Sequence, residues 1–291
     1  MPDIMGKMDI AFPHIGVYLE NVPKNFTVFG FTIALYGVII GMGFLLALVF
    51  ITQIAKRTDQ NPDDYWDLAI YIIIFSILGA RAYYVFFAWD YYKDNPISII
   101  NIRNGGLAIY GGVLAGFLTL FLYTRIKKKS FLKFGDTIMF GLLLGQIIGR
   151  WGNFTNREAF GEYTDSLLAM RLPVEMVRSG EITELMREHM SDATNFVQVS
   201  PTFLYESLWN LGVLILMLLY LRHKKFDGEM ILFYLGGYGL GRSWIEGLRT
   251  DQLIMHTTHL PVSQMLAVCL VIFAVVTDAI VRLKLRRTAN S

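Results

Sequence analysis

A full membrane-helix length passes without one charged side chain in VFGFTIALYGVIIGMGFLLALVFITQI, residues 28–54. A helix needs about 20 predominantly apolar residues to cross the hydrocarbon core of a bilayer. Further apolar runs of comparable length follow at residues 65–88, 106–124, 134–154, 201–221, 229–248 and 261–283. The sequence therefore predicts an all-α, polytopic integral membrane protein with about seven transmembrane helices. We expect these helices to form a single transmembrane domain over residues 1–291.

The composition supports this class and excludes several others. Of 291 residues, 54% are hydrophobic and only 17% are charged, which is too apolar for an ordinary soluble domain of this size. The net charge is +2 and the basic residues cluster between the apolar runs, so no nucleic-acid partner is expected. The single cysteine, Cys269, excludes an internal disulfide, and every histidine falls outside the apolar runs. We expect a monomer without a metal or an organic cofactor.

Basic residues gather in alternate connections between the apolar runs. They follow or end the first, third, fifth and seventh runs as Lys56, Arg57, Arg125, Lys127, Lys128, Lys129, Lys133, Arg222, Lys224, Lys225, Arg282, Lys284, Arg286 and Arg287. Cytoplasmic loops of membrane proteins carry the excess of lysine and arginine. The pattern predicts an extracytoplasmic N-terminus and a cytoplasmic C-terminus, in agreement with an odd number of spans.

The connection at residues 155–200 is long and rich in acidic side chains. Long connections are often lids or binding elements, although a solvated spacer would explain the same composition. We expect a small extracytoplasmic cap here, between the fourth and fifth spans. Within it, residues 173–189 have the pattern of an amphipathic helix.

Three arginines lie inside or at the ends of apolar runs: Arg81, Arg150 and Arg242. A charge at the centre of a membrane helix costs roughly 2.5–3.5 kcal/mol on insertion scales, so it is normally kept for a task. The planar fork of a guanidinium suits phosphate oxygens. The arginines therefore indicate an anionic ligand that lives in the bilayer, for which a phospholipid head group is the obvious candidate.

Arg150 lies in GRWGNFTNREAFG, residues 149–161, and Asn153 follows it by three positions. If the helix continues, both side chains share one face and suit a phosphate group. A snorkelling interface arginine with a capping asparagine would have the same pattern.

A second constellation lies in GGYGLGRSWIEGLR, residues 236–249, where Tyr238, Arg242 and Glu246 repeat at intervals of four. This spacing stacks them on one helical face. The charged pair either holds helices together or directs the arginine toward a ligand. Glu206 lies within another apolar run and needs a partner, which we expect to be an intramembrane arginine.

Tyr110 stands between two glycine pairs in NGGLAIYGG, residues 104–112. A break or re-entrant turn at these glycines would put the phenol against a cavity. An aromatic anchor at the membrane interface is the alternative interpretation of the same residue.

These stretches resemble a known family. Residues 149–161 closely resemble the signature of the prolipoprotein diacylglyceryl transferases, which reads roughly G-R-x-G-N-F-x-N-x-E-x-x-G. The likeness extends to Tyr36-Gly37, to GGLAIYGG at 105–112, to SPTFLYE at 200–206 and to GYGLGRSWIEGLR at 237–249.

The resemblance implies a reaction and a location. The diacylglyceryl group of phosphatidylglycerol would pass to the thiol of the lipobox cysteine of a preprolipoprotein. The products would be a thioether and glycerol phosphate, in the first step of bacterial lipoprotein maturation. A multi-pass protein of the bacterial cytoplasmic (inner) membrane without a cofactor is implied as well.

The resemblance also implies site residues. As phosphatidylglycerol-binding residues it implies Tyr36, Arg81, Arg150, Asn153, Glu158, Gly161 and Tyr238, and as catalytic residues Arg150, Arg242, Tyr110 and Glu246. The chain departs from some members, which carry a histidine where Tyr110 stands and His-Pro-Ser-Gln where this chain has residues 200–203. A neutral phenol is a poor general base at neutral pH, so the proton acceptor stays open.

Two other classes of function use the same residues. An anion transporter or channel would need intramembrane arginines, and it predicts flux across liposomes without a covalent product. A non-catalytic lipid-binding scaffold predicts phosphatidylglycerol binding without modification of a peptide. The signature at 149–161 favours the transferase.

Overall fold

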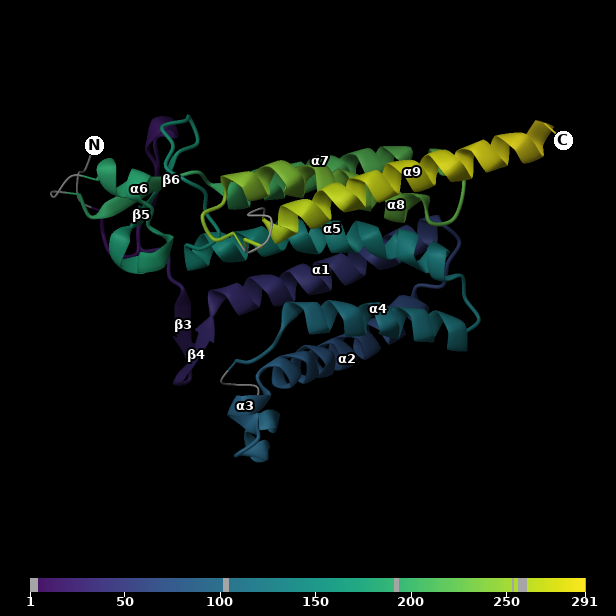
Figure 1. The fold of residues 1–291 in the computed structure, drawn as a ribbon, viewed down its shortest axis with the longest axis horizontal. Helices are drawn as coiled ribbons and strands as arrows, with labels where there is room; N and C mark the ends of the chain where they lie inside the picture. The colour runs from purple at the N-terminus through teal and green to yellow at the C-terminus, as the bar shows by residue number, and fades with distance from the viewer. Residues whose placement is uncertain (1–4, 102–104, 191–193, 253, 256–260, 291) are drawn as a thin grey trace. The chain divides into compact units, whose positions relative to one another are not determined.

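The computed structural model describes residues 5–101, 105–190, 194–252, 254–255 and 261–290. The chain divides into two compact units, one formed by Met1–Ala47 with Met139–Ser291 and the other by Leu48–Ile138. The boundaries between them fall inside helices α1 and α5 (Figure 1). Each unit is described by itself.

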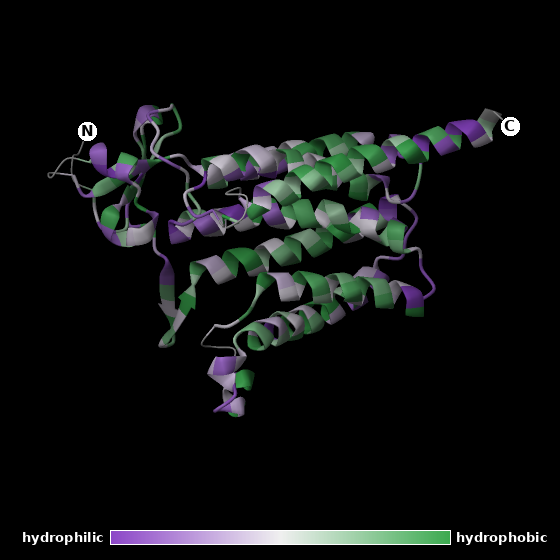
Figure 2. Ribbon diagram, in the orientation of Figure 1, coloured by the Kyte–Doolittle hydropathy of each residue, from purple (hydrophilic) through white to green (hydrophobic). Residues whose placement is uncertain are grey.

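Helices dominate the described chain, and each predicted apolar run corresponds to one of them. The long helices are α1 Leu35–Arg57, α2 Asp63–Phe87, α4 Ile109–Ile126, α5 Phe131–Asn156, α7 Thr202–Tyr220 and α9 Val262–Asn290. These 6 helices are long and apolar enough to cross a membrane (Figure 2). The mainly helical, multi-span class is confirmed.

The sixth predicted span, residues 229–248, is shorter in the structure than the other six. Helix α8, Glu229–Ile245, has 17 residues, and a 3-10 turn, η6 Glu246–Leu248, extends it. A span needs about 20 residues, so α8 reaches that length only with its 3-10 extension. The predicted count of seven is therefore approximate.

The first helix begins later than the apolar run predicts, at Leu35. Strands β3 Asn25–Val28 and β4 Phe31–Ala34 form a hairpin ahead of it. Phe29 and Gly30, with φ of 49° and 81°, turn the chain, as tight hairpins with two positive-φ residues do. The Leu35 amide donates to Lys24 O at 2.9 Å, which closes the hairpin onto the start of α1.

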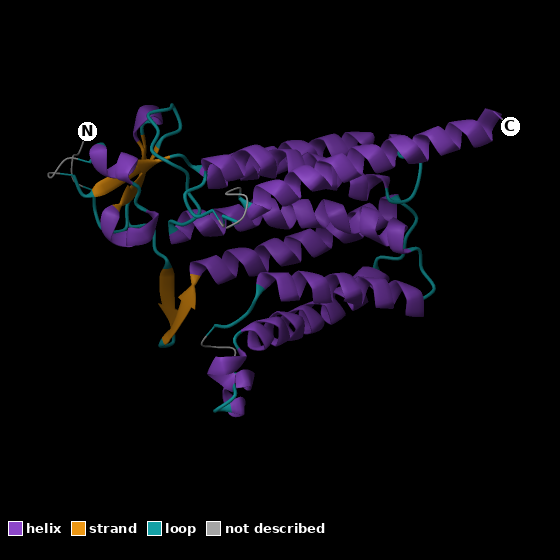
Figure 3. Ribbon diagram, viewed as in Figure 1, coloured by secondary structure: helices purple, strands orange, loops and turns teal. Residues whose placement is uncertain are grey.

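Strands form a second sheet in the capping region, with the order β2-β1-β5-β6 (Figure 3). They are β1 Ile10–Phe12, β2 Val17–Leu19, β5 Met170–Pro173 and β6 Phe196–Val199. All three pairings are antiparallel. The prediction of a purely α-helical chain omitted this sheet, because it joins the N-terminus to residues far along the sequence.

The prediction of an amphipathic helix over residues 173–189 is wrong. The segment contains the 3-10 turns η3 Val174–Met176 and η4 Ser179–Glu181 and only a short helix, α6 Glu184–Glu188. Pro173 ends strand β5, and Gly180, inside η4, lowers the helix propensity of the segment. Thr183 caps α6 by accepting from the Met186 amide at 3.2 Å.

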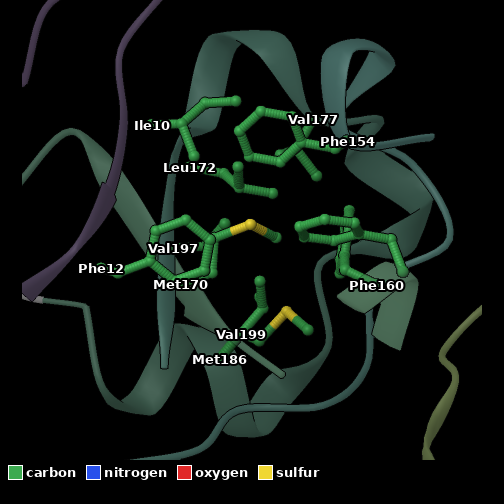
Figure 4. Packing of buried hydrophobic residues seen from close by; sticks show 11 residues of the cluster. Ile10, Phe12, Phe154, Phe160, Met170, Leu172, Val177, Met186, Val197 and Val199 are labelled. Carbon is green, nitrogen blue, oxygen red and sulfur yellow. The ribbon is translucent and has the colours of Figure 1, made fainter. Parts of the chain in front are cut away.

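An apolar core joins this sheet to the ends of two membrane helices. Phe154 and Phe160, which flank the turn after α5, pack among buried side chains of β1, β5 and β6 (Figure 4). Phe203 in the first turn of α7 belongs to the same cluster. Burial of large apolar side chains contributes roughly 1.5–3 kcal/mol each, so the sheet fixes the ends of α5 and α7 firmly.

Helices α7, α8 and α9 lie side by side in the first unit (Figure 1). Gly241 of α8 faces Trp209 of α7, where an added Cβ would come within 2.2 Å of the indole ring. Trp209 Nε1 also donates to Gly237 O at 2.8 Å. Small residues permit such close helix contacts in membranes. The contact brings Arg242 of α8 next to Glu206 of α7.

The second unit contains α2 and α4 packed along each other, with α3 Trp89–Tyr92 and the 3-10 turn η2 Pro96–Ile100 between them. Gly116 of α4 lies against the Ser76 hydroxyl of α2, where an added Cβ would stand at 2.9 Å. The helices therefore pack closely through small residues.

Candidate functional site

A buried carboxylate, Glu206, forms the centre of a charged cluster in the first unit. Its Oε2 lies 2.6 Å from Arg150 Nη2 of α5, and its Oε1 lies 2.9 Å from Arg242 Nη1 of α8. Arg249 Nη1, just beyond η6, lies 3.5 Å from the same Oε1. Glu206 is only 4% exposed. The expectation that an intramembrane arginine pairs with Glu206 is confirmed, with three arginines in place of one.

Two further carboxylates complete the charge balance. Glu246, one helical turn after Arg242, forms an ion pair with Arg242 Nη2. Asp251 accepts from Arg249 Nε at 2.8 Å and from Nη2 at 2.7 Å in a bidentate fork. Three arginines thus face three carboxylates, so the buried charges neutralise one another.

Asp251 and Arg249 lie beyond the last turn of the α8 segment. Burial raises the pKa of the Asp251 carboxyl, but the hydrogen bond and charge of Arg249 outweigh it, so that pKa is lowered overall. Burial likewise lowers the pKa of Arg249, and the bond to Asp251 reverses the direction. The pair is therefore held fully ionised at neutral pH.

The end of α5 extends this cluster toward the cap. Arg150 Nη1 donates to Asn153 Oδ1 at 3.4 Å, as their spacing on one helix face predicts. Asn153 Nδ2 donates to Glu158 Oε1 at 3.0 Å. Arg178, an exposed cap residue, lies 3.7 Å from Glu158 Oε2. Polar contacts therefore run from the cap surface through Asn153 to the Arg150–Glu206 pair.

Arg157 was not among the predicted site residues, and it fixes the turn that carries Glu158. Its guanidinium is buried and donates to Thr155 O, Met8 O and Val22 O, each at 2.6 Å. Burial lowers its pKa, with a smaller raising effect from Asp9. Arg157 itself has a positive φ of 54°, an uncommon conformation for a residue other than glycine. The N-terminal segment thereby holds the turn in shape.

Gly161 belongs to a tight contact. Its backbone forms an isolated antiparallel bridge with Arg249, and an added Cβ would lie 2.6 Å from Leu248 O. Its amide donates to Ser200 O at 2.9 Å. Gly161 therefore lets the signature turn approach the end of the α8 segment, where Arg249 lies.

Two tyrosines of the predicted set lie in the same unit. The Tyr36 ring of α1 packs on Gly152, where an added Cβ would come within 2.7 Å of Cδ2. Tyr238 stacks on Tyr234 with ring centroids 5.5 Å apart, and Gln146 Nε2 of α5 donates to the Tyr234 hydroxyl at 2.9 Å. Both tyrosines are partly exposed, so their rings are available to a ligand.

Arg81 and Tyr110 lie in the second unit. All five N–H groups of the buried Arg81 side chain are donated to backbone carbonyls, those of Ser98, Ile99, Asn101, Gly105 and Gly106. The expectation that Arg81 binds phosphate stays a prediction, while these contacts favour a role in holding the segment before α4. Tyr110 is the second residue of α4 and is 55% exposed.

The geometry suits one kind of chemistry. Arg150 and Arg242 keep 19% and 15% of their side chains exposed, while the carboxylates that hold them are 4% exposed. Each guanidinium group is thus held by a buried carboxylate, and its exposed part can contact a ligand. Such fixed cations stabilise negative charge that develops on a phosphate oxygen.

Fold and site together define a multi-pass membrane protein with a buried arginine–carboxylate centre suited to an anionic lipid. The chain belongs to the prolipoprotein diacylglyceryl transferase family, whose model matches residues 23–280.

Curated relatives agree with the family. A phosphatidylglycerol–prolipoprotein diacylglyceryl transferase of Clostridioides difficile is 42% identical over 79% of this chain and 84% of the relative. Proteins of the same name from Bacillus licheniformis and Finegoldia magna are 41% and 39% identical. They cover 86% of this chain in each case and 88% and 92% of their own lengths. The family expected from residues 149–161 is confirmed.

Proposed function

We propose that this chain transfers the diacylglyceryl group of phosphatidylglycerol to the lipobox cysteine of a prolipoprotein in the bacterial cytoplasmic membrane. The names of the relatives supply donor and acceptor. The observation that carries the proposal in this chain is the pair of arginines, Arg150 and Arg242, held by the buried Glu206.

The reaction exchanges one bond for another at a glyceryl carbon. The cysteine sulfur forms a bond to the carbon that carries the phosphate, and the bond from that carbon to the phosphate oxygen breaks. The electron pair of that bond leaves on the phosphate oxygen, and the thiol proton passes to a base. A cysteine thiol has an ordinary pKa of about 8.5, so modest activation gives the thiolate nucleophile.

The charge on the leaving phosphate determines what the two arginines must do. Negative charge grows on the ester oxygen as the carbon–oxygen bond breaks, and we assign Arg150 and Arg242 to stabilising it. Asn153 adds a neutral donor beside Arg150. Glu246 orients Arg242 through an ion pair, and Glu158 orients Asn153 by accepting a hydrogen bond from its amide.

The remaining predicted residues receive supporting roles. Tyr36 and Tyr238 line the head-group site with partly exposed rings, and Gly161 lets the signature turn approach Arg249. Tyr110 either donates a hydrogen bond to the phosphate or relays the thiol proton. We assign Arg81 to holding the segment before α4 rather than to binding lipid.

The orientation follows from the loop charges. With the basic connections in the cytoplasm, the N-terminus and the cap lie on the outer face and the C-terminus inside. All residues of the proposed arginine centre lie on one chain, so a monomer is sufficient to form it.

The test of function is identification of both products. Purified protein is mixed with phosphatidylglycerol and a synthetic lipobox peptide, and mass spectrometry follows the peptide and the released glycerol phosphate. A diacylglyceryl mass gain that is lost with a Cys-to-Ser peptide supports the transferase. Flux across liposomes, or lipid binding without peptide modification, would favour the transport or scaffold function instead.

A further inference from the structure

Glu206 has more arginine partners than any other described carboxylate of this site, and the family signature at 149–161 does not include it. Three elements of the first unit direct guanidinium groups at its two oxygens: α5, α8 and the segment after η6. Phe203, on the turn of α7 before it, is anchored in the core of the cap sheet. The Glu206 carboxylate is therefore anchored in place, and it determines where the three arginine side chains lie.

Electrostatics explains why such a carboxylate is needed. Three guanidinium groups that converge in a water-poor region repel one another strongly, because the local dielectric constant is low. Arg150 forms an ion pair with Glu206 Oε2 and Arg242 with Glu206 Oε1, so each arginine contacts a different oxygen. One carboxylate thus sets both the separation and the direction of the two forks.

Arg249 is the third arginine that contacts the Glu206 carboxylate, at the same oxygen as Arg242. Its Nε and one Nη are committed to Asp251, at 2.8 and 2.7 Å, and the remaining Nη lies 3.5 Å from Glu206 Oε1. With only 11% of its side chain exposed, it has little surface for a ligand. Its position is that of a clamp on Glu206 and not of a third phosphate ligand.

We propose that Glu206 is a positioning residue of the transfer reaction: it aligns Arg150 and Arg242 on the leaving phosphate, and Arg249 with Asp251 clamps it. This inference rests on the proposed function and deepens it. Glu206 does not touch the reacting atoms, and it acts through the two arginines.

A positioning role has a kinetic signature that differs from that of a packing role. Glu206→Gln keeps the shape of the side chain but removes its negative charge. The cluster as a whole then becomes more positive, and Arg150 and Arg242 are no longer aligned by an ion pair with residue 206. Attraction of the anionic head group in the ground state is kept, and stabilisation of the transition state is lost. The variant should lower kcat and leave KM for phosphatidylglycerol unchanged.

The chain offers a matched control at the first residue of α8. Glu229 is 2% exposed, pairs with Arg282, and accepts from the Tyr220 hydroxyl at 2.9 Å. Glu229→Gln therefore removes a buried, arginine-paired carboxylate of the same unit that has no contact with Arg150 or Arg242. It should cost thermal stability without a specific effect on kcat.

The experiment measures kcat, KM for phosphatidylglycerol and the thermal midpoint Tm of the full-length wild type, Glu206→Gln and Glu229→Gln. We expect kcat of Glu206→Gln to fall about 10- to 100-fold, with KM within about threefold of wild type. Glu229→Gln should keep kcat within about twofold. A wild-type kcat in Glu206→Gln, or an equal loss in Glu229→Gln, would overturn the positioning role.

A second variant keeps the test decisive if Glu206→Gln does not fold. Arg249→Lys keeps the positive charge but loses the fork that engages Asp251 and Glu206 together. Its kcat should fall about tenfold at constant KM, and an unchanged kcat would refute the clamp. Wild-type protein that forms no thioether product would refute the proposed function itself, an outcome separate from normal turnover in the variants.

Discussion

At the scale of single residues, the arginines of this chain do different work although the sequence presents them alike. Arg150 and Arg242 are held by buried carboxylates and keep an exposed side. Arg81 and Arg157 donate to backbone carbonyls and hold segments of chain. The ligand-facing and the backbone-holding arginines differ in how many N–H groups remain for a ligand. Only the structure shows this number.

Tyr110 gives a prediction about a single hydroxyl. Tyr110→Phe keeps the ring and removes only the hydroxyl, so a role in hydrogen bonding or proton relay should lower kcat about 10- to 100-fold. Steady-state transfer to the lipobox peptide measures it, with Tyr91→Phe, an exposed tyrosine of α3, as the control. Unchanged turnover in Tyr110→Phe would confine this residue to packing or interface anchoring.

Asp251 gives a prediction about pH. Its pKa is lowered in the folded protein, so its ionised form stabilises the fold above the unfolded pKa. That stabilisation is lost as the pH falls through the lowered folded pKa. Tm of wild type should exceed that of Asp251→Asn at about pH 6, and the gap should shrink toward about pH 3. Asp90→Asn, at a 94% exposed side chain, should show no such gap, and a gap independent of pH would contradict the assignment.

At the scale of elements, the signature turn and the end of the α8 segment depend on one contact. Gly161→Ala puts a methyl group 2.6 Å from Leu248 O and 2.9 Å from Ser200 Cβ. The resulting shift should displace Arg249 and lower turnover about tenfold or more. Gly180→Ala is the matched control in the cap, because no atom lies within 4 Å of its added Cβ. Equal turnover in the two variants would show that this contact is not needed.

Element positions were predictable where the signal is local. The membrane helices follow from the length and apolarity of their runs, and the Arg242–Glu246 pair follows from its spacing of four. The hairpin at β3 and β4 escaped prediction because its phenylalanines continue the apolar run of α1. The cap sheet escaped it because β1 pairs with β5, and no local pattern encodes a partner so distant in sequence.

The charged centre was only partly predictable for the same reason. The sequence indicates that Glu206 needs an arginine, but not which arginines from α5 and α8 converge on it. Arg249 carried a usable signal, since it follows Arg242 by seven residues and so shares its helical face. Arg157 carried none, because its partners Met8 and Val22 come from the N-terminal segment.

At the scale of the whole molecule, the loop charges predict which ends of the helices face the cytoplasm. Cys269 is the single cysteine, so Cys269→Ser gives a background for site-directed labelling. In intact cells, a membrane-impermeant maleimide should label Ser179→Cys of the cap and spare Arg222→Cys after α7; both positions are exposed. Labelling of Arg222→Cys alone would reverse the orientation.

We propose that the fixed guanidinium groups of Arg150 and Arg242 stabilise the leaving phosphate, and a single-turnover measurement isolates this step. Excess enzyme, wild type or Arg242→Ala, is mixed with phosphatidylglycerol and lipobox peptide, and thioether formation is followed in time. We expect a rate about 100- to 1,000-fold lower in Arg242→Ala, with lipid still bound through Arg150. A single-turnover rate within about twofold of wild type would contradict it.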